Sequence, residues 1–259
     1  MNKRGLRVFA GLCALLMVTL CAVPSNAQMA EVKQKPAMYS YVANWQIPRA
    51  HWADLEKSAA TRNAILEKAM ADGTLIGYGE DINMVHSADG WTHDNWWSAM
   101  SMAGLVKILD QFLATEVSAS PSAIATKHYD LVFVSHYYSW KPGAYKGGYV
   151  HVSEYKFKAD APDDALDLLA QHLIVPAMDK LVADGTVTEY EIDEMAIHTS
   201  APGTFSIVYV TPTPEGLDTV SAAIRALGKA HPLGIDAFGS FTDDNGHRDE
   251  LGKGNGVFK

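Results

Sequence analysis

The tetrapeptide Ala-Asp-Gly-Thr at residues 71–74 recurs unchanged at residues 183–186, which is 112 positions later in a chain of 259 residues. One short repeat arises by chance, but further blocks match in the same order on both sides of it. They are 66–68 with 178–180, Tyr78 with Tyr190, 86–87 with 198–199 and 104–105 with 216–217, all at a spacing of 112, together with 41–47 and 151–157 at 110 and 97–98 and 205–206 at 108. An ordered series of matches with small shifts in spacing indicates that one structural unit occurs twice.

The first copy has the pattern of alternating strands and helices. Residues 39–47 alternate in polarity and are rich in aromatic side chains, which favours a strand, whereas 49–71 carry apolar residues at helical spacing. Gly73 stands where a glycine that caps the C-terminus of a helix is expected. The other predicted elements are strands at 74–86, 96–102 and 129–140 and a helix at 104–115.

The second copy repeats this order of elements. Asp160 is expected to cap a helix over 161–182, in which Pro162 fits the first turn and Pro176 predicts a kink or a break. The Gly- and Asp-rich residues 243–259 are expected to form a flexible tail. The other predicted elements are strands at 149–158, 186–198 and 204–211, a helix at 213–227 and a weaker strand at 234–242.

Each copy therefore has the order β-α-β-β-α-β, which is the ferredoxin-like unit. A single unit carries helices on one face of its sheet only, so the opposite face needs a cover. Two units in one chain can cover each other, and this arrangement resembles the dimeric α/β-barrel superfamily over about residues 38–242. The resemblance implies an α+β fold in which two tandem ferredoxin-like units pack as a pseudo-dimeric α/β barrel. The expected segments are a short N-terminal extension at 28–37, units at 38–140 and 149–242, a linker at 141–148 and the tail at 243–259.

Residues 1–27 have the organisation of a secretory signal peptide. A basic start precedes an apolar run of about 16 residues, and small residues then stand before a cleavage position after Ala27. A membrane span needs roughly 20 apolar residues, so the run favours cleavage over anchoring. Both cysteines, Cys13 and Cys21, lie in this segment and leave the mature chain without a disulfide or a thiolate site. The sequence predicts an exported protein, periplasmic or secreted, with no membrane insertion after cleavage.

Composition and charge narrow the classes of partner. With 48% hydrophobic and 20% charged residues, the chain is typical of globular proteins. Its formal net charge of −9 disfavours phosphate backbones and anionic lipid surfaces. Nucleic acid is therefore not expected as a partner, and a small hydrophobic or aromatic ligand is.

Two histidines are the first candidates for chemistry. His86 and His198 end the equivalent long strands of the two copies, and a hydroxyl residue follows each of them. One interpretation makes them acid–base or ligand-binding imidazoles around a central cavity. The other is structural, because an imidazole and a hydroxyl can also satisfy the backbone of the loop that follows.

Aromatic and imidazole side chains gather at three further places. The segment 91–97 contains three indoles, an imidazole and a carboxylate, whereas the second copy has a plain loop there. The segments 136–140 and 149–155 carry such side chains on predicted strands. They suit stacking on a flat ligand and hydrogen bonding to it, and they equally suit half-buried strands. The predicted ligand-binding residues are Tyr41, Trp91, His93, Trp96, Trp97, His136, Tyr138, His151 and Tyr155.

Several familiar motifs are missing from the sequence. It contains no GxGxxG, Walker loop, GxSxG or HExxH pattern, and no metal site is predicted. Residues 243–246 lack the ordered acidic spacing of a calcium loop.

Three interpretations of function remain. The resemblance implies a small-molecule binder or a cofactor-independent enzyme, since the superfamily includes monooxygenases without cofactors, small cyclases and decarboxylases; His86 or His198 would then act as the base. A second interpretation is a haem protein, because some tandem ferredoxin-like families bind haem through a helical histidine and His172 lies on a predicted helix. The third is a non-enzymatic module with a side-chain-filled centre. A monomer or a homodimer suits all three.

Overall fold

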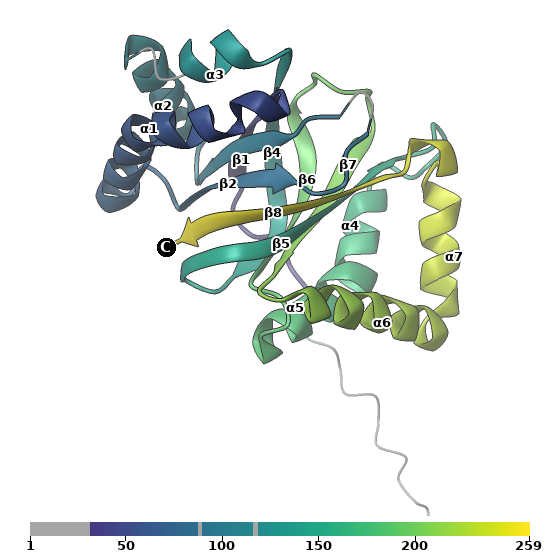
Figure 1. Cartoon of the computed structure of the whole chain (residues 1–259). Coiled ribbons are helices and arrows are strands. Elements are labelled where there is room, and N and C mark those ends of the chain that lie inside the picture. Colours follow the sequence, from purple (N-terminus) through teal and green to yellow (C-terminus); the bar gives the residue numbers. More distant parts are fainter. Residues whose placement is uncertain (1–31, 88–89, 116–118) are drawn as a thin grey trace, which may run out of the picture. The chain divides into compact units, whose positions relative to one another are not determined.

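Eight antiparallel strands close into a barrel in the computed structural model, which describes residues 32–87, 90–115 and 119–259 (Figure 1). The strands are β1 (Met38–Gln46), β2 (Gly77–Asn83), β3 (His93–Ala99), β4 (Lys127–Trp140), β5 (Gly143–Lys156), β6 (Glu189–Ile197), β7 (Thr204–Thr211) and β8 (Arg248–Phe258). Around the barrel their order is β1-β3-β2-β8-β5-β7-β6-β4, and β4 pairs with β1 to complete the ring. Strands β1 to β4 thus form one ferredoxin-like sheet and β5 to β8 the other, and the sheets join along β2–β8 and β4–β6.

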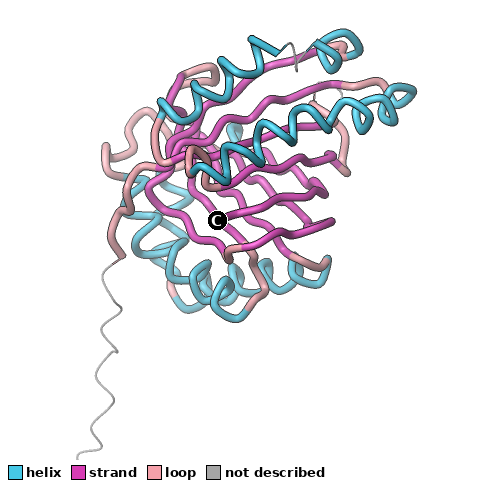
Figure 2. The backbone as a smooth tube through the Cα atoms, turned by 90° about the vertical axis from the view of Figure 1, so that its left-hand side faces the viewer, coloured by secondary structure: helices cyan, strands magenta, loops and turns pink. Residues whose placement is uncertain are grey.

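The helices lie outside the barrel in two groups, one over each sheet (Figure 2). Those of the first unit are the 3₁₀ turn η1 (Arg49–His51), α1 (Trp52–Asp72), α2 (Met102–Thr115) and α3 (Ala119–Ile124). Those of the second are α4 (Ala165–Leu169), the π-helical turn η2 (Ala170–Ile174), α5 (Val175–Asp184), α6 (Pro214–Ala230), α7 (Pro232–Phe241) and the 3₁₀ turn η3 (Asp244–Gly246).

Each sheet has a hydrophobic core between its outer face and its helices. In the first unit, Leu105 and Ile108 on α2 are buried against Trp97 on β3. In the second, Val220 on α6 and Phe205 on β7 belong to the corresponding core. Burying one such side chain contributes about 1.5–3 kcal/mol, so these two outer cores stabilise the barrel without filling its centre.

The repeated tetrapeptide ends the first long helix of each unit. Gly73 follows α1 with φ +82° and Gly185 follows α5 with φ +89°, a left-handed conformation that glycine adopts without strain. The preceding aspartates accept hydrogen bonds from the amides of Thr74 and Thr186, at 2.9 and 3.0 Å. The repeat is therefore a helix-capping motif, and the predicted role of Gly73 is confirmed.

Pro176 lies in the first turn of α5, directly after the π-helical turn η2. Proline lacks an N–H group and its ring crowds the preceding helical turn, so the ordinary helical hydrogen-bond pattern cannot continue through it. The helix predicted over 161–182 is interrupted before Pro176, as expected. It begins at Ala165 with Asp164 at the N-cap position, so the predicted cap at Asp160 and the predicted place of Pro162 in the first turn are wrong.

Two predictions about the C-terminal region are wrong. Residues 234–242, expected as a strand, lie mostly in helix α7, and 243–259, expected as a flexible tail, contain β8. Strand β8 pairs with β2 on one side and β5 on the other, and these two ladders hold a glycine-rich segment of weak intrinsic strand preference (Figure 1). The predicted linker is shorter than expected, because β5 begins at Gly143.

The second strand of each unit is also shorter than predicted. Strand β2 covers Gly77–Asn83 instead of 74–86, and β6 covers Glu189–Ile197 instead of 186–198. His86 and His198 consequently lie beyond the strand ends.

The cross-strand registers show which residues of the two units are equivalent. Asp81 faces Asp94 across β2 and β3, and Asp193 faces Ser206 across β6 and β7. Corresponding members of these pairs are 112 residues apart. The spacing of 112 therefore holds in the second and the third strand of the unit. The predicted match at a spacing of 108 is therefore wrong.

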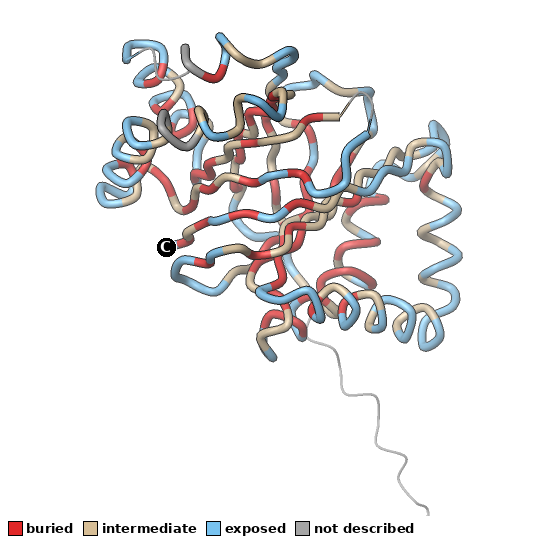
Figure 3. The backbone as a smooth tube through the Cα atoms, viewed as in Figure 1, coloured by how far each residue is buried: buried red, intermediate tan, exposed pale blue. Residues whose placement is uncertain are grey.

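Alternate residues of each strand point outward to the helices and inward to the barrel axis. On β6, Tyr190 and Ile192 belong to the outer core, while Glu189, Glu191 and Asp193 line the interior. Several strands contain consecutive buried residues, as their colouring shows (Figure 3), so both faces of the sheets carry buried side chains. A strand with period 2 thus carries two different chemistries, apolar outside and acidic inside.

The predicted signal peptide lies outside the described residues and stays a prediction. Among the residues that the structure describes, no helix combines the length and apolar character that crossing a membrane requires.

Candidate ligand-binding site

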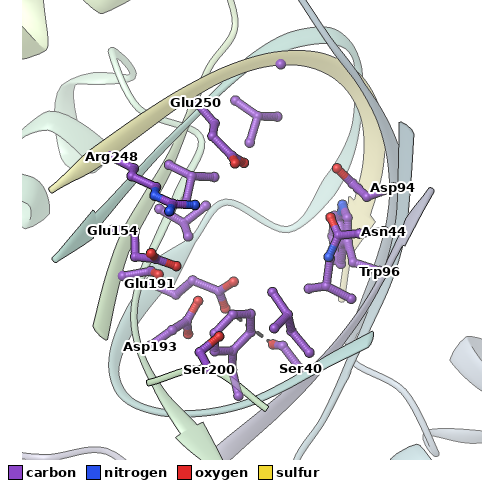
Figure 4. Close-up of a pocket in the computed structure, with 18 of the residues that line it drawn as sticks. Ser40, Asn44, Asp94, Trp96, Glu154, Glu191, Asp193, Ser200, Arg248 and Glu250 are labelled. Carbon is purple, nitrogen blue, oxygen red and sulfur yellow. Dashed lines mark hydrogen bonds between the residues drawn. The ribbon is translucent and has the colours of Figure 1, made fainter. Parts of the chain in front are cut away.

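A cavity of about 640 Å³ occupies the barrel interior (Figure 4). Its wall consists of inward-facing residues from both sheets together with loop residues at one end. The acidic members of that wall are Asp81, Asp94, Glu154, Glu189, Glu191, Asp193 and Glu250. Volumes of 300–1,000 Å³ are typical of small-molecule sites. Most such sites are lined mainly by apolar side chains, so this concentration of carboxyl groups is unusual.

Asp81 and Asp94 form the first acidic group, on directly paired positions of β2 and β3. Both residues are 5% exposed. The indole N–H of Trp96 donates to Asp81 Oδ2 at 3.1 Å, and the two carboxyl groups also interact with each other. Burial raises the pKa of Asp81 to about 7. Burial and the adjacent charge of Asp81 hold the pKa of Asp94 well above its usual range.

Glu189, Glu191 and Asp193 form the second acidic group, at alternate positions of β6. The hydroxyl of Ser135 on β4 donates to Asp193 Oδ1, and the hydroxyl of Ser40 donates to Glu191 Oε2 at 3.4 Å. Burial raises the pKa of Asp193 to about 7 and those of the two glutamates well above their usual range. Like-charge repulsion within the group adds to the effect on the glutamates.

A third group stands at the more open end of the cavity. Glu154 on β5 lies opposite Arg248 on β8, and Glu250 follows two residues later on the same face (Figure 4). Burial raises the pKa of Glu250 to about 7, and the nearby Arg248 acts in the opposite direction. Lys156 and Arg248 are the basic side chains among the described residues of the cavity wall.

Two aromatic rings that line the cavity, Trp96 and Phe258, begin a stack that continues to Trp140 and Tyr138 outside the cavity wall. Trp96 stacks on Phe258 at 5.2 Å between ring centroids, Phe258 on Trp140 at 5.5 Å, and Trp140 on Tyr138 at 5.3 Å. Tyr145 joins Phe258 in a small cluster of buried apolar side chains. We refer to Trp96, Phe258, Trp140 and Tyr138 as the aromatic stack.

Four buried polar atoms on the cavity wall have no hydrogen-bond partner among the described residues. They are Asp81 Oδ1, Asp94 Oδ1, Asn44 Nδ2 and the hydroxyl oxygen of Tyr145. Native proteins rarely leave buried polar atoms unpaired, since each costs about 1–3 kcal/mol. All four belong to residues that border the same space, which makes a bound molecule or solvent their natural partner.

The structure brings two of the predicted ligand-binding residues to the cavity, Trp91 and Trp96. Trp91 belongs to the loop before β3 and interacts with Glu250 through a side-chain hydrogen bond. The other predicted residues do not line this cavity.

Most of those remaining residues occupy the outer faces of the sheets. Tyr41 stacks on Trp97 at 4.3 Å beneath α2, and His93 meets the ring of Trp52 edge-on at 4.7 Å. Burial lowers the pKa of His93 to about 4, so this imidazole is neutral at pH 7. Two other predicted residues also lie on outer faces: His151 stacks on Tyr209 at 5.0 Å, and Tyr155 stacks on His247 at 4.5 Å.

A register shift in β4 separates the predicted group at 136–140. The shift lies between Ser135 and Tyr137, so simple alternation does not hold across it. Tyr138 donates to the carbonyl of Pro36 at 2.9 Å, and His136 Nδ1 lies 3.1 Å from the carbonyl oxygen of Lys35. Both residues therefore hold the segment that precedes β1.

His86 and His198 lie outside the cavity wall as well. Both are exposed, and the ring of His86 lies 6.1 Å from that of Trp52. A catalytic role for either residue stays a prediction, and neither of them lines a cavity formed by the described residues.

The carboxyl groups were missed by reasoning from the sequence. A signal existed in the segment EYEIDE at 189–194, where acidic residues alternate with apolar ones on a predicted strand. Such alternation is normally interpreted as a solvent-facing side, and only closure of the barrel turns that side inward.

His172, the predicted haem ligand, lies on η2 and is exposed outside the barrel. The cavity wall, as far as the structure describes it, contains no histidine that could bind the haem iron. Its acidic side chains would also repel the propionate groups of a haem. These two places do not fit a haem group. Within the described ranges, no group of three or more His, Cys, Asp or Glu side chains could hold a metal ion.

Solved structures share this architecture at low sequence identity. A candidate monooxygenase from Lactobacillus acidophilus has a TM-score of 0.60 and 10% identity, covering 84% of this chain and 94% of its own. An anthrone oxidase-like protein has a TM-score of 0.52 and 9% identity, with 85% and 92% covered. Chlorite dismutase from Candidatus Nitrospira defluvii has 0.50 and 15%, with 84% and 90% covered.

No protein-family model matches the sequence, and no curated protein matches it significantly. Identities at this level show the fold alone. The predicted resemblance is nevertheless confirmed at that level, because strand order, barrel closure and structural neighbours agree. The chain has the fold of the dimeric α/β-barrel superfamily, with both ferredoxin-like units in one polypeptide.

Proposed function

We propose that this protein binds a small organic molecule in the cavity at the centre of its barrel. The observation that carries the proposal is the set of four unpartnered polar atoms on one cavity wall, at Asn44, Asp81, Asp94 and Tyr145. A protein with a purely structural centre would fill it with side chains, as cores are close-packed. Here the interior instead combines open volume, polar atoms that lack partners and flat aromatic surface.

A second candidate function is a cofactor-independent enzyme that uses Asp81 and Asp94 as an acid–base pair. Two interacting carboxyl groups in a buried site share protons, so one can donate while the other accepts at the same pH. The direct pairing of these residues across β2 and β3 favours this candidate over one built on the exposed His86 and His198. If a reaction is found, Asp81→Asn should lower kcat far more than it changes KM.

Native mass spectrometry of the protein purified from its own compartment tests binding directly. We expect extra mass that corresponds to a small organic molecule. Val208 lines the cavity, so Val208→Phe should remove that mass by occupying its space, whereas Val106→Phe on the exposed side of α2 should keep it. Retention of the molecule by a folded Val208→Phe variant would place it elsewhere and contradict the proposal.

Export is part of this proposal and rests on residues 1–27 alone. Sequencing the N-terminus of the protein from fractionated cells checks it. We expect a mature chain that starts at Gln28, and a retained Met1 would contradict export by cleavage.

A further inference from the structure

We propose that the molecule bound in the barrel is an organic cation, a protonated amine on a flat apolar body of about the size of an indole. This inference rests on the proposed function and assigns the chemical class of the ligand. The argument uses the distribution of charge in the cavity, the unpartnered atoms and the aromatic stack.

The charge of the cavity wall is strongly one-sided. Seven acidic side chains line it, and the basic side chains of its described part, Lys156 and Arg248, come from the open end. Arg248 faces Glu154 across β5 and β8, which balances the acidic residues there. Around Asp81 and Asp94 the structure describes no salt-bridge partner. Buried carboxyl groups without a cation stay protonated or take up a positive charge from elsewhere.

The unpartnered atoms include hydrogen-bond acceptors on residues of this acidic region. Asp81 Oδ1 and Asp94 Oδ1 are two acceptors that lack donors among the described residues. The hydroxyl of Tyr145, also unpartnered, offers a further acceptor. An ammonium group carries three donors and no acceptor, so it can supply the donors that the two carboxyl oxygens and the neutral hydroxyl oxygen lack.

Flat apolar surface lies next to these acceptors. Trp96 donates to Asp81 and at the same time stacks on Phe258, so the carboxyl group and the aromatic stack are adjacent. An aromatic or aliphatic body can lie on this surface, and a cation near an indole face gains a further attraction. Gly79 leaves room for the Trp96 ring, because a Cβ there would come within 2.6 Å of that ring.

The groups that face the proposed ammonium come from several strands, and all of them are relevant to its protonation chemistry. They are Asp81 on β2, Asp94 and Trp96 on β3, Tyr145 and Glu154 on β5, Glu189, Glu191 and Asp193 on β6, and Arg248 and Glu250 on β8. A cation that enters this environment favours the ionised carboxylates, so its binding should release protons from the protein.

The test uses three probes with one ring system and different charge: tryptamine, tryptophol and indole-3-acetate. Isothermal titration calorimetry at pH 7 in two buffers of different ionisation enthalpy measures both affinity and proton exchange. We expect tryptamine to bind at least ten times more tightly than tryptophol, with proton release, and indole-3-acetate to bind least. The variant Asp94→Asn should weaken tryptamine at least tenfold and leave tryptophol within about twofold.

A matched control is Asp110→Asn, the same chemical change on the exposed face of α2, which should leave all three affinities unchanged. Equal or tighter binding of tryptophol or indole-3-acetate would overturn the cation assignment and leave the proposed function standing. Failure of all three probes to bind would overturn this inference, while extra mass on the native protein would still support the proposed function. Tryptamine binding without proton release would also count against the inference.

Discussion

Asp81 and Asp193 occupy the same position in the two halves of the molecule, yet their surroundings differ. Asp193 lies opposite a serine on each neighbouring strand, Ser206 on β7 and Ser135 on β4, and it accepts a hydrogen bond from Ser135. Asp81 lies opposite Asp94 on β3 and a glycine on β8. One half therefore gives its aspartate a hydroxyl donor from a directly opposite serine, whereas in the other half the donor is the Trp96 indole and a directly opposite residue is a second acid.

The difference shows how a duplicated fold can acquire a site in one copy. Both aspartates are buried, and burial raises the pKa of each to about 7. In the first half, Asp81 Oδ1 and Asp94 Oδ1 lack hydrogen-bond partners among the described residues, whereas both carboxyl oxygens of Asp193 are absent from that group. A shared backbone geometry thus holds a satisfied acid on one side of the barrel and an unsatisfied pair on the other.

The largest expected effect is on stability as a function of pH. Folded-state pKa values of about 7 at Asp81 and Asp193, and a pKa of Asp94 well above its usual range, exceed the unfolded value near 4, so the folded protein binds more protons above pH 4 than the unfolded chain does. The stabilisation is complete below the unfolded pKa and is lost as pH rises through the folded pKa. We expect the free energy of unfolding to fall by at least about 2 kcal/mol between pH 6.5 and 8.5 in urea denaturation.

The same measurement on Asp94→Asn sharpens the comparison of the halves. Removing one acid of the unsatisfied pair should flatten the slope with pH, whereas the exposed Asp110→Asn should not change it. Stability that stays constant or rises over this range would contradict the burial of protonated carboxyl groups. The pH range begins at 6.5 because the buried His93 has a folded-state pKa of about 4 and an unfolded pKa of 6.5. Its burial therefore lowers the free energy of unfolding only below about pH 6.5.

The next effect concerns the glycine that faces Asp81. A Cβ at Gly254 would lie 1.7 Å from Asp81 Oδ1 and 2.2 Å from the carbonyl oxygen of Glu80, so Gly254→Ala should displace the carboxyl group. We expect a loss of about 1–3 kcal/mol in chemical denaturation, which is typical of overpacking. Gly252→Ala is the matched control, because its Cβ would meet only ordinary contacts of 3.5 Å or more. Equal stability of the two variants would show that Asp81 does not lie over Gly254.

A smaller effect is expected at the equivalent position of the second half. Ser135→Ala removes the hydroxyl that donates to Asp193 and makes this half resemble the first. We expect a cost of about 1 kcal/mol at pH 7 and a rise in the pKa of Asp193, measured by NMR titration of carboxyl carbons. An unchanged pKa would mean that Ser135 does not hold the ionised form.

The smallest effect is expected from Trp96→Phe. This change removes the N–H that donates to Asp81 Oδ2 but keeps a ring to stack on Phe258. Stability should change by about 1 kcal/mol or less, while the pKa of Asp81 should rise, because a donor to its ionised form is lost. A fall in that pKa would contradict the assigned hydrogen bond.

The sequence predicted the order of elements well because that order depends on local patterns. Helix caps at Gly73 and Gly185, helical periodicity in 49–71 and alternation in β1 and β7 depend on short-range stereochemistry, and strand β7 has the predicted bounds. The last strand was misplaced because β8 is rich in glycine, and ladders to β2 and β5 stabilise it in place of intrinsic preference. No local window contains that information.

The candidate site was predicted less well, for a related reason. Aromatic and imidazole residues attracted attention as ligand-binding types, but Tyr41 and Trp97 belong to an outer core, and His151 stacks on Tyr209 of the other outer core. The acidic residues that line the cavity looked like ordinary polar positions of half-exposed strands. Which face of a strand points inward depends on how the sheet closes, and a bulge such as the one in β4 changes it partway along the strand.

The sequence by itself determined that the chain contains one ferredoxin-like unit twice, because repeated capping and periodicity survive in the residues themselves. Tertiary structure decided what the barrel encloses. Closure of the two sheets through β2–β8 and β4–β6 turned alternating acidic residues from a face that would meet water into the wall of a cavity. Burial then changed their chemistry, since a carboxyl group removed from water keeps its proton unless a positive charge comes to meet it.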